Sequence, residues 1–157
     1  MPPLPWTDAL EIGLPVMDRT HREFVELLAR AQTSSNDALP AAWQALIDHT
    51  EAHFAQEDAW MRATEFSLSQ AHSIQHNVIL RVLREGAARA AEGNLTSVRL
   101  MTRELAIWFP QHAQTLDTAL ASHLLQVGFD PATGEMSAPP KEAHKGGCGK
   151  CGNCHCG

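Results

Sequence analysis

The segment that decides the fold is residues 49–57, which read HTEAHFAQE. Along an α-helix, side chains four positions apart lie above one another on the same face. His49, His53 and Glu57 therefore form one row, on the stripe that an amphipathic helix turns towards its core. Because a buried imidazole or carboxylate needs a partner, this row predicts either a bound metal ion or an internal ion pair.

Three further amphipathic segments accompany this one. The predicted helices span residues 18–32, 40–63, 69–92 and 96–127. Asp18 and Ser69 are suited to cap the first and third helices, and Pro40 suits the first turn of the second. Gly93 and Gly128 suit the ends of the third and fourth helices. Four helices joined by short connections predict an all-α fold, an up-down-up-down antiparallel four-helix bundle.

The chain is expected to divide into three parts. Residues 1–17 form an extended N-terminal arm, residues 18–128 form the bundle, and residues 129–157 form a flexible linker and a Cys/Gly-rich tail. The tail cannot bury enough apolar surface to offset its ordering entropy, so we expect it to be disordered. Pro110 lies inside the fourth helix, where it removes a backbone hydrogen bond and predicts a kink between Ala106 and His112.

Composition argues against several function classes. The net charge of −6, from 12 Lys and Arg against 18 Asp and Glu, provides no basic surface for nucleic acid. The first residues have neither the basic start nor the apolar run of a signal peptide, and no later run is long enough to span a bilayer. We therefore expect a cytoplasmic protein with no nucleic-acid or membrane partner. We also expect it to be a monomer.

The cysteines form a separate motif near the C-terminus. All four lie within the tail, at Cys148, Cys151, Cys154 and Cys156, so the core needs no disulfide. Together with His155 they offer a ligand set for zinc, copper(I) or an iron–sulfur cluster, although their spacing fits no common zinc ribbon or finger. Two interpretations stay open: a second metal or redox site at these cysteines, or an inert extension.

Each predicted helix directs at least one potential metal ligand inwards near its middle. These ligands are His21, His53, Glu57, His72, His76, His112 and Asp117. In helices of alternating direction they would lie at one level, and they are too many for one ordinary metal ion. Two octahedral ions, bridged by both carboxylates and by one oxygen, would keep one position open. A mixed nitrogen and oxygen set with a vacancy suits iron better than structural zinc.

One spacing conflicts with regular helical geometry. Five positions separate His112 from Asp117, which places them about 140° apart around a regular α-helix. Both side chains can face one cluster only if the metals lie between their directions or if the helix is locally distorted.

The order of these residues resembles the hemerythrin family, in particular its single-domain bacterial members. The resemblance covers residues 6–127 and includes Trp6, Gly13 and Asp18 shortly before the first histidine. It rests on His21, His53-x3-Glu57, His72-x3-His76 and His112-x4-Asp117, in this order on four predicted helices. Any one of these motifs is weak alone, whereas all of them in order are specific.

The resemblance implies a ligand set and a function. His72, His76 and His112 would hold one iron, His21 and His53 would hold the other, and Glu57 and Asp117 would bridge the two together with an oxo or hydroxo group. The second iron would keep a position free for dioxygen. The implied function is reversible oxygen binding for storage, buffering or transport in the bacterial cytoplasm, without enzymatic turnover.

Two other functions are alternatives to this one. The first is an oxygen or nitric oxide sensor, or an iron-homeostasis module, that acts through a partner; no output domain in the sequence supports it. The second is a di-iron oxidase or peroxidase, which the nitrogen-rich ligand set disfavours because such enzymes use more carboxylates.

The remaining polar residues receive ordinary interpretations. We expect His49 to be a partly buried histidine outside the ligand set, and His123 and His144 to be surface residues. Three acidic residues of the second helix should form a solvated face: Asp48, Glu51 and Asp58. We expect the apolar wall of the site to consist of Trp108, Phe54 and either Leu28 or Phe24.

Overall fold

The computed structural model describes residues 2–137, and nearly all of their regular structure is helical. The elements are a short 3₁₀ helix η1 (Asp8–Leu10), then α1 (Pro15–Thr33), α2 (Leu39–Ala63), α3 (Ser69–Ala91), α4 (Leu95–His112), a π-helical segment η2 (Ala113–Asp117) and α5 (Thr118–Gln126). α4, η2 and α5 follow one another without a break, so they count as the fourth helix of the bundle. The predicted all-α four-helix bundle is therefore confirmed.

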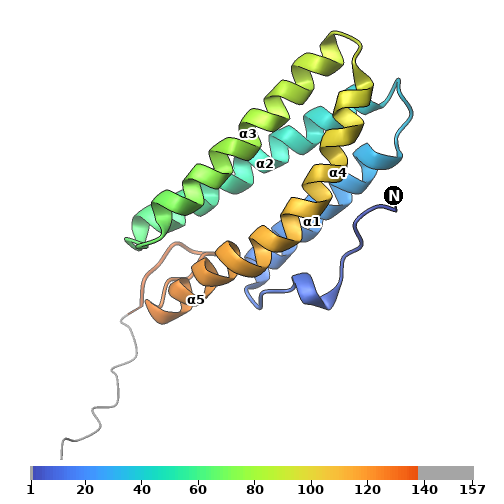
Figure 1. Ribbon diagram of the computed structural model, residues 1–157. Helices are drawn as coiled ribbons and strands as arrows, with labels where there is room; N and C mark the ends of the chain where they lie inside the picture. The colour runs from blue at the N-terminus through green and yellow to red at the C-terminus, as the bar shows by residue number, and fades with distance from the viewer. Residues whose placement is uncertain (1, 138–157) are drawn as a thin grey trace, which may run out of the picture.

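The four helices form a closed ring. α1 packs against α2, α2 against α3 and α3 against α4, and α4 returns to contact α1. The connections at residues 34–38, 64–68 and 92–94 are too short to cross the bundle, so neighbouring helices run in opposite directions (Figure 1). Between residues 2 and 137 the structure contains no strand, only one isolated bridge between Phe129 and Met136. None of the helices in this range is long and apolar enough to cross a membrane.

α3 and α5 each end just before a glycine, as predicted. Gly93 adopts a φ of 81° after α3, and the next residue, Asn94, donates its N–H to the carbonyl of Arg89. Gly128 adopts a φ of 68° after α5, and Phe129 donates in the same way to Leu124. Both ends use the left-handed conformation that glycine adopts without strain.

Helix starts differ from the prediction at two positions. Asp18 does not cap α1, because the helix already begins at Pro15; its carboxylate accepts hydrogen bonds from Ile12 N at 2.7 Å and Gly13 N at 3.0 Å. Ser69 is the first residue of α3, which has no side-chain cap. The capping prediction was wrong at both residues, since α1 begins four residues earlier and α3 one residue earlier than a cap at these positions would require.

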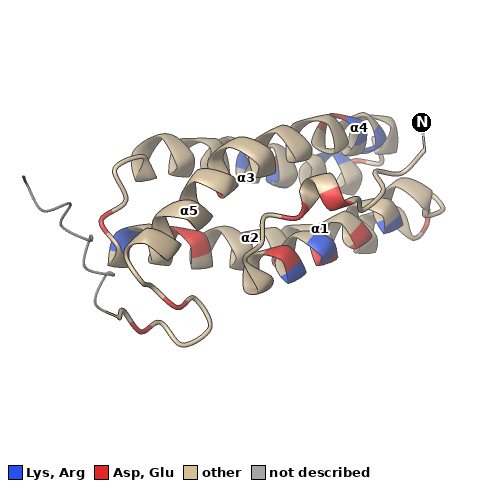
Figure 2. Cartoon of the chain, turned by 90° about the horizontal axis from the view of Figure 1, so that it is seen from below, with Lys and Arg blue, Asp and Glu red and all other residues tan. Residues whose placement is uncertain are grey.

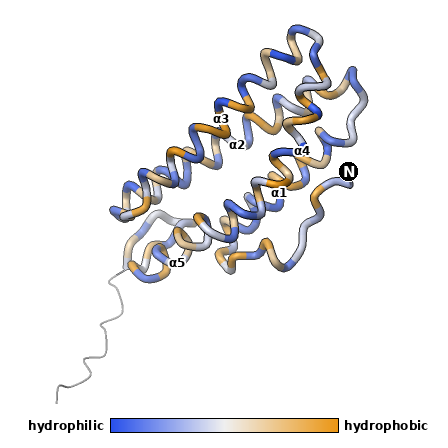
Figure 3. Tube along the Cα trace, in the orientation of Figure 1, coloured by the Kyte–Doolittle hydropathy of each residue, from blue (hydrophilic) through white to orange (hydrophobic). Residues whose placement is uncertain are grey.

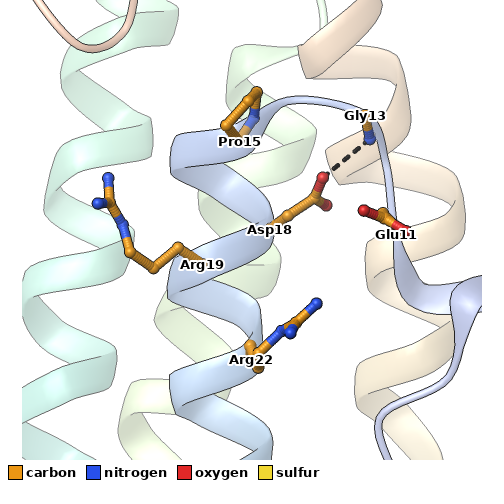
Figure 4. A pocket seen from close by; sticks show the side chains of 6 residues that line it. All are labelled: Glu11, Gly13, Pro15, Asp18, Arg19 and Arg22. Atoms are coloured by element: carbon orange, nitrogen blue, oxygen red, sulfur yellow. Dashed lines mark hydrogen bonds between the residues drawn. The ribbon is translucent and has the colours of Figure 1, made fainter.

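The N-terminal arm is fastened to the bundle along its length. Figure 4 shows Asp18 turned back towards Gly13 at the edge of a surface pocket between the arm and α1. Further along the arm, Trp6 lies under the guanidinium of Arg22, and the buried side chain of Leu10 joins the core. These contacts place the arm against α1.

Hydrophobic and hydrophilic residues alternate along each helix, as Figure 3 shows. The buried apolar side chains form two packed clusters in the core. Near the α1–α2 and α3–α4 connections the core is built around Trp43, which is fully buried and donates its indole N–H to the carbonyl of Leu83 at 2.8 Å. Gly86 allows this close approach of α2 to α3. A Cβ at Gly86 would lie 2.6 Å from the Trp43 ring.

Charged residues of both signs alternate along the outer side of α1, as Figure 2 shows. The helix therefore presents no uniform positive surface. This agrees with the mixed, slightly acidic composition of the chain.

Ordered structure continues beyond the expected end of the bundle at residue 128. Phe129 is buried in the apolar cluster that includes Met17 and Trp60, and Ser137 donates its backbone N–H to the carbonyl of Gly128 at 2.8 Å. Residues 129–137 therefore form a turn packed on the bundle, because one aromatic side chain anchors them there. The expected disorder of the tail and its four cysteines concern residues outside the described range.

Candidate metal centre

The candidate site lies between two apolar clusters that fill the two ends of the bundle. One cluster includes Phe24, Leu46 and Leu105, and the other includes Met17 and Trp60. In the layer between them, all four helices turn polar side chains inwards. Since polar groups are costly to bury without partners, a complete polar layer inside an apolar bundle indicates a function.

The structure brings together all seven predicted ligand residues. Their side chains come from α1, α2, α3 and the α4–η2 junction, and each residue is at most 6% exposed. They are His21, His53, Glu57, His72, His76, His112 and Asp117.

The two carboxylates lie at the centre of the cluster. Glu57 approaches the Nε2 atoms of His53 at 3.2 Å and His76 at 3.1 Å through its two different oxygens. Its second oxygen also lies 3.7 Å from His72 Nε2. Each oxygen of Glu57 therefore faces a different histidine.

Asp117 holds the corresponding position on the other side. Its Oδ2 atom lies 3.0 Å from His21 Nε2, and its Oδ1 atom lies 3.0 Å from His72 Nε2 and 3.2 Å from His112 Nε2. Both carboxylates thus reach histidines on opposite sides of the cluster. This is the arrangement required of ligands that bridge two ions.

None of these close approaches has the geometry of a hydrogen bond. The five histidine Nε2 atoms and all four oxygens of Glu57 and Asp117 are buried and lack a hydrogen-bond partner. Buried polar atoms in folded proteins are almost always paired, so nine such atoms at one place need an explanation. Ligand atoms of these residues lie within 4.8 Å of one another in groups of three or more, which is close enough to share a metal ion. Nitrogen and carboxylate oxygen together suit iron.

These atoms fall into two overlapping groups, each compact enough to hold one metal ion. The larger group consists of Glu57, His72, His76, His112 and Asp117. The smaller group consists of His21, His53 and Glu57. Glu57 belongs to both, so the donor set fits two adjacent ions better than one.

The π-helical segment explains how His112 and Asp117 face the same cluster. Residues 113–117 form i→i+5 hydrogen bonds, such as the one from the backbone N–H of Thr118 to the carbonyl of Ala113. In this geometry residues five apart lie above one another, instead of about 140° apart. The distortion that the spacing required is therefore present. α4 itself stays α-helical through Pro110, and the change of helical geometry begins only at Ala113.

Electrostatics bind the cluster together when it carries no metal. Burial acts to lower the pKa of His72, but the carboxylates of Asp117 and Glu57 outweigh it and raise this pKa to about 9. The pKa of His53 is also raised, because Glu57 outweighs its burial. Burial acts to raise the pKa of Glu57 and of Asp117, yet the facing histidines hold both below their usual values.

In two histidines the Nδ1 atom, which faces away from the cluster, has a hydrogen-bond partner. The sequence did not predict these partners. The Nδ1–H of His76 donates to Asp58 at 3.2 Å, and that of His112 donates to Gln75 at 2.9 Å. Asp58 was expected on a solvated face, but its side chain is only 33% exposed and also accepts a hydrogen bond from Ser73. Its position one residue after Glu57 gave no signal, because this bond depends on how α2 and α3 are rotated against each other.

Aromatic rings cover the cluster. Phe54 stacks on His76 with ring centroids 3.8 Å apart, and Trp108 stacks on His112 at 4.5 Å, so these two predicted wall residues contact the site. Phe24, an alternative for the third wall residue, stacks instead on Phe109 at 4.6 Å. The prediction missed Phe109, which is 2% exposed and packs edge-on against His21 at 5.2 Å. Its signal was the apolar spacing from Leu105, four residues earlier on the same face.

The other histidines stay outside the donor set. His49 donates to Glu23 at 3.1 Å at the edge of the site, and burial lowers its pKa. His123 is not a plain surface residue: it donates to the carbonyl of Thr64 at 3.1 Å and packs on Phe66, so it fastens α5 to the α2–α3 connection. His144 lies outside the described residues.

Comparisons with known proteins agree with this geometry. Residues 13–124 match the family described as the hemerythrin HHE cation binding domain. The chain is 37% identical over 130 residues to a bacteriohemerythrin of Ralstonia nicotianae, a match that covers 83% of this chain and 95% of the relative. It is 32% identical over 139 residues to a bacteriohemerythrin of Stenotrophomonas maltophilia, covering 83% and 90%. Among solved structures it is similar to a variant of hemerythrin, with a TM-score of 0.70 and 20% identity over 79% of this chain and 98% of the other.

Proposed function

Because the chain belongs to the hemerythrin family, we propose that it is a non-haem di-iron protein that binds dioxygen reversibly and stores, buffers or transports it. The observation that carries this proposal is the set of nine buried donor atoms without hydrogen bonds. Water molecules or shared protons would leave several of these nine atoms without a partner, whereas a pair of iron ions could bind all of them.

In this proposal the seven side chains would divide between two ions. His72, His76 and His112 would bind one ion, and His21 and His53 would bind the other. Glu57 and Asp117 would bridge them, which the approach of each carboxylate to histidines of both halves supports. The half with two histidines is one donor short of the other half, so the free position for dioxygen belongs there.

The surroundings favour binding without turnover. A pair of ferrous ions would supply the two electrons with which dioxygen is held reversibly. The protein supplies neutral imidazoles, which add no negative charge to stabilise high-valent iron. Phe54 and Phe109 exclude water from the cluster, which slows irreversible oxidation of a reduced centre. No substrate-binding residue is part of this proposal.

Absorption spectroscopy tests the proposed function. Protein loaded with ferrous iron under anaerobic conditions should be colourless, should turn pink-violet in air and should bleach again when the gas is removed. Repeated cycles with little loss of amplitude support oxygen storage or transport. Permanent conversion to a yellow diferric form would contradict reversible binding and would favour the sensor or iron-homeostasis alternative, in which a partner reads the state of the site.

A further inference from the structure

The five histidines differ in whether their Nδ1 atoms, the ring nitrogens that face away from the cluster, have a hydrogen-bond partner. His76 and His112, both in the larger donor group, donate Nδ1–H to Asp58 and Gln75. The Nδ1 atoms of His21 and His53, in the smaller group, are buried and have no partner among the described residues, and the same holds for His72 in the larger group. Two of the three histidines in the larger group thus have an outer partner, against neither of the two in the smaller group. The cluster is therefore asymmetric beyond its count of histidines.

An outer acceptor prepares a histidine for metal. It fixes the hydrogen on Nδ1, so that the electron pair of Nε2 is free to face the cluster, and it sets the orientation of the ring. Among the described residues, nothing outside the cluster selects this tautomer for His21, His53 or His72. The smaller group therefore has no histidine that is fixed before metal binds, whereas the larger group has two, His76 and His112.

The two acceptors also connect neighbouring helices. Asp58 on α2 accepts from His76 at 3.2 Å and from Ser73 at 2.9 Å, both on α3. Gln75 on α3 accepts from His112 on α4. Two of the three histidines in the larger donor group are thus held by bonds across the α2–α3 and α3–α4 contacts, in addition to helix packing.

Stacking against aromatic rings also restricts His76 and His112. His76 lies parallel to Phe54, with an interplanar angle of 4° and centroids 3.8 Å apart, and His112 is stacked on Trp108 at 26°. His21 and His53 make only edge-on or tilted contacts, with Phe109 at 5.2 Å and Phe54 at 5.4 Å. A stacked ring that is also hydrogen-bonded on its outer edge has little freedom to rotate.

We propose that Asp58 and Gln75 are positioning residues that make the three-histidine half of the centre fill first and hold its ion more tightly, while the half with His21 and His53 fills second and exchanges more readily. This inference rests on the proposed di-iron function. It adds an order of assembly: the half that would bind dioxygen is completed last.

A metal titration of the full-length chain tests this order. Metal-free protein is titrated anaerobically with ferrous iron against a competing chelator, and bound iron is measured at each step. We expect two separate steps of different affinity. Replacing both His21 and His53 by alanine should remove the weaker step and leave the first with its wild-type affinity. Because all variants keep the same cysteine-rich tail, any ion bound there is common to every titration.

Variants of the outer partners test the cause. Asp58→Ala and Gln75→Leu should each weaken the first step by about ten- to a hundredfold, the usual effect of removing such a partner, and should change the second step less. Asp58→Asn keeps an acceptor oxygen without the charge and should restore part of the loss. Asp48→Ala is the matched control, because Asp48 lies on the same helix and bonds only to the exposed Gln44.

The outcomes separate this inference from the proposed function. Iron that binds in one step, first-step affinities unchanged by Asp58→Ala and Gln75→Leu, or loss of the tight ion in the His21 and His53 double variant would each overturn the order of filling while leaving reversible oxygen binding intact. A wild-type chain that binds no iron pair would overturn both. Circular dichroism of each metal-free variant confirms that altered binding does not come from unfolding.

Discussion

At the scale of single residues, some histidines face the buried cluster and others only hold the fold together. His76 has its Nε2 atom 3.1 Å from Glu57 inside the cluster, whereas His123 bonds to the backbone of Thr64. Both are histidines on helices of the same bundle, so they form a matched pair for mutation.

Replacing His76 by alanine should abolish loading of the iron pair, because it removes one of three nitrogen ligands from the better-ordered half. His123→Ala should retain full iron loading and lose about 1 kcal/mol of stability with its hydrogen bond, which lowers the melting temperature by about 2–4 °C. Iron per chain after anaerobic loading and desalting, with thermal unfolding by circular dichroism, measures both effects. Full iron content in His76→Ala would show that His76 is not a ligand.

The raised pKa of His72 predicts that iron binding releases protons. With a pKa of about 9, His72 is protonated in the metal-free protein at pH 7, but it must be neutral to bind metal. Apparent iron affinity should therefore rise with pH and level off near pH 9. Metal-free stability should follow the opposite trend, since the stabilisation of protonated His72 is complete below about pH 6.5 and is lost as the pH rises through 9.

Calorimetry in two buffers of different ionisation enthalpy measures the protons released on binding. Equal heats in both buffers at pH 7 would contradict the protonated state of the metal-free cluster. Thermal unfolding of the metal-free chain between pH 6 and pH 9 provides the independent check on stability.

The sequence predicts which side chains meet at the cluster, but not the partners of their Nδ1 atoms, for a physical reason. His53 and Glu57 lie four positions apart on one helix, so their common direction follows from helix geometry alone. Asp58 and Gln75 matter only because α2, α3 and α4 are rotated so that their side chains meet histidines of a neighbouring helix. That rotation is set by the packing of the whole bundle and leaves no local pattern.

At the scale of elements, the π-helical segment η2 accommodates one residue more than an α-helix would between His112 and Asp117. Sequence analysis identified the conflict in spacing but not the form of its solution. His112 and Asp117 face the same cluster because the change of helical geometry occurs between them.

Deleting the exposed Thr115 should convert η2 to regular α-helix and bring His112 and Asp117 to a spacing of four, which also places them on one face. We therefore expect this variant to retain iron loading. Deleting the exposed Ile74 from the regular α-helix between His72 and His76 should abolish loading, because the rest of α3 then rotates by about 100° relative to the cluster. Iron content of both variants tests the claim, and loss of loading in both would contradict it.

Gly86 is the residue that sets the distance between α2 and α3. In Gly86→Ala the new Cβ would lie 2.6 Å from the buried ring of Trp43, and overpacking of this kind costs about 1–3 kcal/mol. Alanine is favoured over glycine in a helix by about 1 kcal/mol. This gain is smaller than the sum of two costs, the clash with the ring and the weakening of the hydrogen bond from Trp43 to Leu83.

We therefore expect Gly86→Ala to lower the free energy of unfolding by about 1–2 kcal/mol, as measured by urea denaturation. The adjacent and exposed Glu85→Ala is the control, with an expected change within about 0.5 kcal/mol. A stabilised Gly86→Ala variant would show that Trp43 can move away without loss.

Helix ends were easier to predict than helix starts. Gly93 and Gly128 end α3 and α5 because their positive φ angles need glycine, and this requirement is local. The start of α1 depends on the arm, since Asp18 is used to fasten Ile12 and Gly13 instead of the first turn of the helix. A residue that suits a cap can therefore serve a neighbouring segment.

At the scale of the whole molecule, a polar layer is held between two apolar ends. The bundle could be predicted because each of its four helices carries its own apolar stripe. The turn at residues 129–137 could not, because its composition resembles that of the tail and only the burial of Phe129 distinguishes it.

A chain that ends after Pro140 should load the same amount of iron in the bundle and unfold at the same temperature, because the described contacts with the bundle end at Ser137. Total metal per chain should differ between the two forms only if the four cysteines bind metal of their own. Iron loading, zinc content and thermal unfolding of the two forms decide this. Slower or incomplete loading of the shortened chain would instead assign the tail a part in supplying the iron.

The most direct test of the central claim is anomalous diffraction at the iron edge from crystals of the iron-loaded protein. The account predicts two adjacent peaks within the polar layer, one beside His72, His76 and His112, the other beside His21 and His53, with Glu57 and Asp117 between them. A single peak, or iron bound elsewhere on the chain while these seven side chains stay metal-free, would contradict it.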